Sequence, residues 1–173
     1  MQGTISVGNP KEKPYLQTVE LKNAKPEDLR ILSQIHVGDE FGPKEVQYTG
    51  GAAAARLENA EDKIDWYTGK TPWGKPVVTL SGMFGLIHLF ANGSFQAVPF
   101  FGATEINIIN GPIVVDTPYI AANKIICIGA GDRTEFCWLD CTLHEKGTNR
   151  LLATLRHMHR YMKAGSPLYT ELK

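Results

Sequence analysis

Two carboxylates and a phenol lie close together along the chain, at Asp62, Asp65 and Tyr67. A carboxylate can serve as a general base when burial raises its pKa towards neutrality. Tyrosine, whose ordinary pKa is about 10, is a poor base at neutral pH but can donate a proton as a general acid. The three residues are therefore a candidate acid/base group, with Asp65 as the spare carboxylate. The alternative is a polar helix end whose acids are simply solvated.

A loop rich in glycine and proline, residues 69–76, leads into the longest apolar stretch of the chain. Amide N–H groups at the start of a helix can bind a carbonyl oxygen on which negative charge develops. Trp73, Gly74 and Val77 would supply such donors, and Trp66 precedes them along the chain. We expect these four residues to bind substrate.

The histidines are weaker candidates. His88 lies in the apolar stretch, where a lone histidine is usually a hydrogen-bonded core residue; the alternative is a ring that points into a ligand tunnel as a replacement base and contacts substrate. His157 and His159 share one face of a predicted strand, and such a pair can bind a metal ion. Because no third ligand is evident and Arg156 and Arg160 flank the pair, we expect an exposed basic strand end and no metal.

The elements that would position these residues follow from the apolar pattern. After an arm over residues 1–23, one domain spans 24–173, with a helix expected over 52–67. Residues 77–91 are apolar nearly all round, which favours a long helix buried on all sides. The predicted strands are 41–48, 105–109, 113–115, 119–128, 134–144 and 151–162. This order predicts an α+β fold in which one long buried central helix is wrapped by an antiparallel β-sheet.

The composition limits the classes of function. Lys plus Arg equals Asp plus Glu, 18 of each, so no basic excess indicates nucleic acid or a membrane surface as a partner. The apolar stretch is shorter than the roughly 20 residues that a spanning helix needs, and residues 1–17 have no apolar core of a signal peptide. Three sparse cysteines, Cys127, Cys137 and Cys141, indicate reduced thiols in a cytoplasmic protein. No phosphate-binding glycine loop is evident, and we expect no cofactor.

Several motifs, taken in order, resemble the MaoC-like branch of the hotdog-fold superfamily. Val37-Gly38-Asp39-Glu40 is similar to that family's entry turn, and Pro72-Trp73-Gly74-Lys75-Pro76-Val77-Val78 opens the apolar stretch at the family's spacing. Residues 108–116 resemble a later strand and turn of the family. The resemblance spans about Ile35 to Arg160, most of the chain. It is supported by the order and spacing of the motifs more than by any single motif.

The active-site loop of the family, Gly-Asp-x-Asn-Pro-x-His, corresponds here to residues 61–67. Asp62 falls on the catalytic aspartate of the family, whereas Tyr67 stands where the family has histidine. The resemblance therefore implies a hotdog hydro-lyase (a dehydratase or enoyl hydratase) that acts on an acyl thioester or polyketide-type intermediate with an altered catalytic pair.

The missing histidine leaves other interpretations open. One is a non-catalytic acyl-binding partner subunit of a heteromeric hotdog hydratase. Another is a hotdog enzyme with changed chemistry, such as an isomerase, a cyclase or a thioesterase, because a fold alone does not select a reaction. The resemblance also implies a homodimer, or a heterodimer with a second hotdog subunit.

Overall fold

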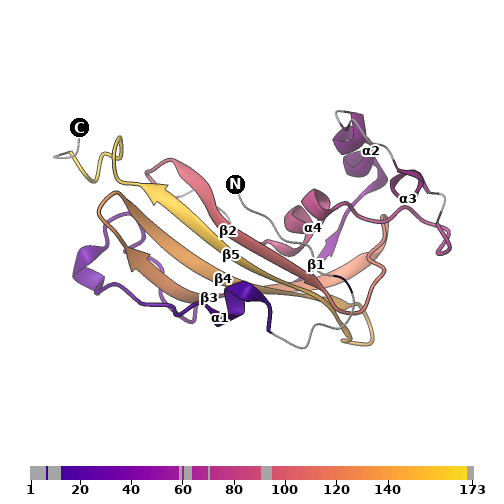
Figure 1. The fold of residues 1–173 in the computed structure, drawn as a ribbon, viewed down its shortest axis with the longest axis horizontal. Coiled ribbons are helices and arrows are strands. Elements are labelled where there is room, and N and C mark those ends of the chain that lie inside the picture. Colours follow the sequence, from indigo (N-terminus) through magenta and orange to yellow (C-terminus); the bar gives the residue numbers. More distant parts are fainter. Residues whose placement is uncertain are drawn as a thin grey trace.

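A five-stranded antiparallel sheet forms the body of the molecule in the computed structural model, which describes residues 7, 13–58, 60, 64–69, 71–90 and 95–170 (Figure 1). Its strands are β1 (Glu40–Gln47), β2 (Pro99–Ile108), β3 (Pro118–Ala130), β4 (Thr134–Glu145) and β5 (Leu151–Met162). Their order is β1-β3-β4-β5-β2, so β1 and β2 are the two edges. The α+β architecture that the sequence predicts is confirmed.

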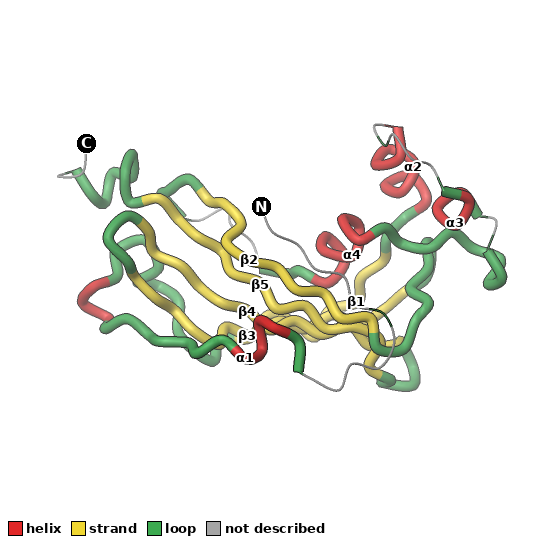
Figure 2. The backbone as a smooth tube through the Cα atoms, in the orientation of Figure 1, coloured by secondary structure: helices red, strands yellow, loops and turns green. Residues whose placement is uncertain are grey.

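The helices are short, and three of them, α2, α3 and α4, lie at one end of the sheet. Figure 2 shows α2 and α3 extending away from the sheet beyond α4. The helical elements are α1 (Tyr15–Thr18), a 3-10 turn (Pro26–Asp28), α2 (Gly50–Glu58), α3 (Asp65–Thr68) and α4 (Leu80–Ile87). The single helix expected over 52–67 is instead divided between α2 and α3. No helix among the described residues is long and apolar enough to cross a membrane.

The central helix α4 packs its apolar side on the sheet. Met83, Leu86 and Ile87 are buried in one cluster with sheet residues such as Ile125 and Leu139. Burial of each such side chain stabilises the fold by about 1.5–3 kcal/mol. The opposite side of α4 faces away from the sheet. This side carries the small residues Ser81 and Gly85, and it leaves space for a pocket.

The two ends of α4 are fixed by side chains, and the helix is therefore shorter than the predicted 77–91. It begins where the hydroxyl of Thr79 accepts the N–H of Gly82 at 3.0 Å. It ends where the buried amide of Asn123 in β3 donates to the carbonyl of Ile87 at 2.8 Å and accepts the N–H of Leu89 at 2.5 Å. These bonds occupy backbone groups at the C-terminal end, so the chain leaves the helix at His88 in an extended conformation.

Three further segments differ from the prediction. The strand expected over 105–109 begins earlier, because β2 spans Pro99–Ile108. The expected strand 113–115 makes one isolated antiparallel bridge, between Val114 and Val77. The N-terminal arm is held to the sheet, because the N–H of Leu16 donates to the Glu105 carboxylate and its carbonyl accepts from the Arg156 guanidinium. These contacts place α1 on the side of the sheet that α4 does not cover.

A buried carboxylate holds the opposite end of the sheet. Glu135 in β4 is fully buried, and its oxygens accept the backbone N–H groups of residues 30, 31 and 32 at 2.8–3.1 Å. The Tyr169 hydroxyl donates to the same carboxylate at 2.5 Å. The entry segment and the C-terminal tail thus meet at one side chain.

The three cysteines are free thiols, as the sequence predicts. All of them are buried, and burial raises the pKa of Cys137 to about 12. A thiol is nucleophilic only as the thiolate, so Cys137 is unreactive at neutral pH.

Candidate functional site

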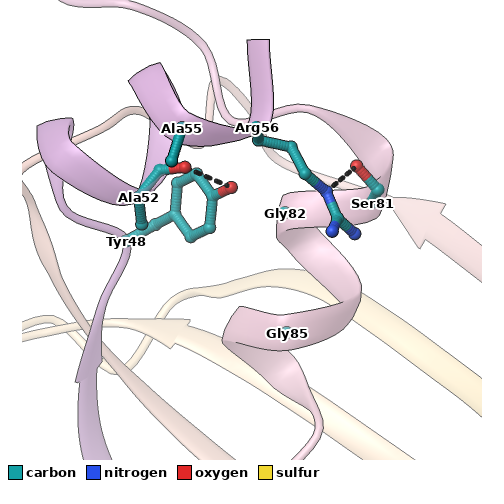
Figure 3. Close-up of a pocket in the computed structure, with 7 residues that line it drawn as sticks. All are labelled: Tyr48, Ala52, Ala55, Arg56, Ser81, Gly82 and Gly85. Atoms are coloured by element: carbon teal, nitrogen blue, oxygen red, sulfur yellow. Dashed lines mark hydrogen bonds between the residues drawn. The ribbon is translucent and has the colours of Figure 1, made fainter. Parts of the chain in front are cut away.

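A pocket of about 500 Å³ lies between α2 and α4 (Figure 3). This volume is within the roughly 300–1,000 Å³ of small-molecule sites. The residues that line it are Tyr48, Ala52, Ala55, Arg56, Ser81, Gly82 and Gly85.

Small residues on α4 open this pocket. Ser81 and Gly85 are one turn apart, so they share the helix face that points away from the sheet. Gly82 allows the ring of Tyr48 to approach, because a Cβ at this position would lie 2.8 Å from Tyr48 Cζ. At Gly85 an added Cβ would meet no atom within 4 Å, so the space beside it is open.

The polar groups of the pocket form a short chain of hydrogen bonds. Figure 3 shows Arg56 reaching from α2 to α4, where its Nε–H donates to Ser81 Oγ at 3.0 Å. Ser81 Oγ lies 3.3 Å from Thr79 Oγ1, the same oxygen that caps α4. On the other wall, the hydroxyl of Tyr48 donates to the carbonyl of Ala52 at 3.4 Å. Among the described residues that line the pocket, Arg56 is the one charged side chain and none is an acid.

Two of the three predicted acid/base residues, Asp65 and Tyr67, lie in α3. Asp62 is outside the described residues. Asp65 is exposed in the first turn of α3, and Tyr67 in the same helix is partly buried. Neither of them is among the residues that line the α2/α4 pocket.

The predicted substrate-binding residues of the loop do come together, although away from the pocket lining. The rings of Trp66 and Trp73 meet edge to face, with centroids 5.3 Å apart, and Val77 N–H donates to the carbonyl of Trp66 at 2.8 Å. The N–H of Gly74 donates to the carbonyl of Thr71 at 3.2 Å. Because the amides of Gly74 and Val77 already have acceptors, they do not serve as the carbonyl-binding donors that the sequence predicts.

Three histidines form a cluster at the C-terminal end of α4. His88 Nε2 and His159 Nε2 are 2.8 Å apart, and His157 Nδ1 lies 2.8 Å from Thr104 Oγ1. The rings of His157 and His159 have centroids 4.3 Å apart. The cluster is packed among Phe84, Phe90, and Phe101.

The expectation of an exposed basic strand end is wrong, because His157 and His159 are 0% and 1% exposed. Side chains alternate along a strand, so the flanking arginines lie on the other face of β5. There Arg156 pairs with Asp140 at 2.6 Å. In the described residues, no group of three His, Cys, Asp or Glu side chains is placed to hold a metal ion.

Burial keeps the three imidazoles neutral. Desolvation lowers the pKa of His88 to about 4 and that of His159 to about 4. For His157, desolvation and the two neighbouring rings lower the pKa to about 3. His157 Nε2 and His159 Nδ1 are buried and have no hydrogen-bond partner within the described structure.

Sequence reasoning identified neither the pocket nor the cluster as a unit. The two glycines at 82 and 85 indicate close approach of a neighbour to the helix, but nothing in the sequence pairs Arg56 with Ser81, which is 25 positions away. Likewise, His88 and His159 are 71 positions apart and meet only because α4 crosses β5.

Known structures share this arrangement of strands and helices. The chain is similar to a monoamine oxidase regulatory protein from Archaeoglobus, with 10% identity, a TM-score of 0.57, and coverage of 83% of this chain and 98% of that one. It is also similar to an (R)-hydratase from A. caviae involved in PHA biosynthesis, with 16% identity, a TM-score of 0.53, and coverage of 73% and 96%. A third match is the ChsH1-ChsH2 complex from Mycobacterium tuberculosis, with 9% identity, a TM-score of 0.52, and coverage of 74% and 87%. No protein-family model and no curated protein sequence matches the chain.

Proposed function

Since the chain has the hotdog fold of these proteins, we propose that it is a MaoC-like hydro-lyase that acts on an acyl thioester or polyketide-type intermediate. The observation that carries the proposal is the pocket beside the start of α4, which places polar groups and open space next to one another. Such a pocket can receive an acyl group and orient its carbonyl oxygen.

The first turn of α4 is the proposed place for the thioester carbonyl. A helix leaves its first N–H groups without intrahelical acceptors, and that of Gly82 is already capped by Thr79. Within the described residues, no acceptor is recorded for the N–H groups of Leu80 and Ser81, and Ser81 lines the pocket. These two amides take the role that the sequence assigned to Gly74 and Val77. They would stabilise the negative charge that develops on the carbonyl oxygen.

The acid/base work falls to Asp62 and Tyr67, with Asp65 as the spare carboxylate, in the segment that joins α2 to α4. In hydration, Asp62 takes a proton from water as the water oxygen bonds to the β-carbon, and Tyr67 donates a proton to the α-carbon. Dehydration runs the same steps in reverse. Trp66 and Trp73 would cover the acyl group from the α3 side.

Turnover of the purified protein on a crotonyl thioester and a longer trans-2-enoyl thioester tests the proposal. We expect hydration that falls at least a hundredfold in Asp62→Asn and in Tyr67→Phe, in line with the loss of a general acid or base, typically 10²–10⁴-fold (an order-of-magnitude range). Asp132→Asn, in an exposed turn between β3 and β4, is the matched control. Equal rates in Asp62→Asn and the wild type would refute the assigned role.

A non-catalytic partner subunit is the second candidate, favoured by the tyrosine at the histidine position. One structural match is itself a two-component complex. This alternative expects a folded protein that shows no turnover alone and gains activity only with a second hotdog subunit.

Self-association is part of either proposal. The edge strand β2 exposes Phe100 and Phe101, 37% and 60% of whose surfaces are accessible, and Val98 beside it is 64% exposed. Exposed apolar groups on an unpaired strand edge favour pairing with a second chain. We therefore propose a homodimer, or a heterodimer with a second hotdog subunit. Light scattering after size exclusion gives the mass, and a monomer at micromolar concentration would contradict it.

A further inference from the structure

We propose that Arg56 makes the α2/α4 pocket a receptor for a carboxylate carried by the acyl ligand. The preferred ligand would then be a dicarboxylic half-thioester, with its free carboxylate on Arg56, in place of an uncharged alkyl chain. The identity of the ligand as an acyl thioester rests on the proposed function. The charge of the pocket is a separate observation.

The guanidinium of Arg56 is oriented by its neighbours. Its Nε–H is bonded to Ser81 Oγ, and Ser81 is in contact with the hydroxyl of Thr79. A guanidinium carries five N–H donors in a planar fork. Because only the Nε–H is engaged by a described residue, the terminal N–H groups remain for a ligand.

No carboxylate competes for this arginine among the described residues. Two other cations do have acidic partners: Lys124 pairs with Glu40 at 2.9 Å, and Arg156 pairs with Asp140 at 2.6 Å. Arg56 has no such ion pair in the described structure, and none of the described residues that line the pocket is an acid. An incoming anion would therefore supply the missing negative charge.

The shape and charge of the pocket favour a carboxylate over a phosphate. A planar carboxylate matches the guanidinium fork and carries one negative charge, equal to the single positive charge of the lining. A phosphate group carries up to two negative charges, and one cation would leave it partly uncompensated. Ala52, Ala55 and Gly85 supply small apolar walls, which suit a short alkyl segment beside the charged group.

Calorimetric titration with two matched ligands tests the inference. The succinyl and butyryl thioesters of N-acetylcysteamine both lack phosphate, and they have the same number of chain carbons. We expect the wild type to bind the succinyl thioester about two- to fivefold more tightly, because Arg56 is exposed and this is the range for a solvent-exposed charge pair. Arg56→Gln should lose this preference and keep its affinity for the butyryl thioester, while Arg56→Lys retains part of it.

Arg150→Gln removes the same charge from a distant hairpin and should leave the preference unchanged. Equal binding of the two thioesters by the wild type would overturn the inference, as would a preference that survives in Arg56→Gln. Arg56-dependent binding of 4′-phosphopantetheine with no preference for succinyl would do so too, because it would assign the arginine to the carrier. If the protein prefers the succinyl thioester but does not hydrate enoyl thioesters, only the proposed reaction is refuted. If it hydrates enoyl thioesters but shows no preference for the succinyl thioester, only the carboxylate site is refuted.

Discussion

Acidification should unfold this protein through the histidine cluster. In the unfolded chain, each histidine has a pKa of about 6.5 and is protonated below it. In the folded chain, desolvation holds the pKa of His88 and His159 near 4 and that of His157 near 3. Between these values the unfolded state binds more protons, so the free energy of unfolding rises with pH. Stability is therefore complete above pH 6.5 and is lost as the pH falls towards 4.

The size of the loss follows from the shifts. One pKa unit corresponds to about 1.4 kcal/mol, so one of these histidines alone costs about 3 kcal/mol between pH 6.5 and pH 4. Single domains have a total stability of about 5–15 kcal/mol. Three histidines that titrate together are thus sufficient to remove a large part of it.

Urea unfolding at a series of pH values between 7 and 4 measures this effect. We expect the free energy of unfolding to depend less steeply on pH in His157→Leu than in the wild type. The slope should be smaller by up to about 1.4 kcal/mol per pH unit, because the variant takes up one proton fewer on unfolding. His36→Gln is the control, because the side chain of His36 is 76% exposed. A wild-type stability that stays constant from pH 6.5 to pH 4, or an unchanged slope in His157→Leu, would refute the reasoning.

Three further predictions concern α4. Gly85→Ala should raise the melting temperature, because alanine is favoured in a helix interior by about 0.5–1 kcal/mol and its Cβ meets no atom within 4 Å; a lower melting temperature would contradict the open space described there. Gly82→Ala should destabilise by about 1–3 kcal/mol in urea unfolding, because the new Cβ would lie 2.8 Å from Tyr48 Cζ; an unchanged midpoint would show that the Tyr48 ring moves freely. Asn123→Ala should cost about 1–3 kcal/mol for each backbone group that it leaves unsatisfied, and hydrogen exchange at Leu89 should accelerate; slow exchange there would show that the helix end has another support.

The strands were largely predictable from the sequence. The segment 119–128 is apolar and 134–144 alternates between apolar and polar residues. The predicted segments 119–128, 134–144 and 151–162 differ from β3, β4 and β5 by no more than two residues at any end. The central helix was less predictable. Its apolar residues continue to position 91, but Asn123 in a distant strand ends the helix after Ile87.

The candidate site was harder to predict than the fold. The rule that strand neighbours face opposite sides applies to Arg156 and His157, yet the charges of the arginines suggested an exposed strand end. The pocket depends on the contact between Arg56 and Ser81, which no local pattern encodes. The spacing of Gly82 and Gly85 is the local signal that points to it.

The carboxylate of Glu135 also constrains the order in which the chain assembles. It joins residues 30–32 and Tyr169, more than a hundred positions apart from one another, through a strand that belongs to neither segment. Neither segment can complete its bonds until β4 has paired within the sheet, so both are expected to dock late in folding. In the native protein the Glu135 carboxylate also couples the opening of the two segments. When the tail leaves the sheet, Glu135 loses its hydrogen bond from Tyr169, and Glu135 is the group that holds residues 30–32. The two segments should therefore exchange their amide hydrogens as one cooperative unit.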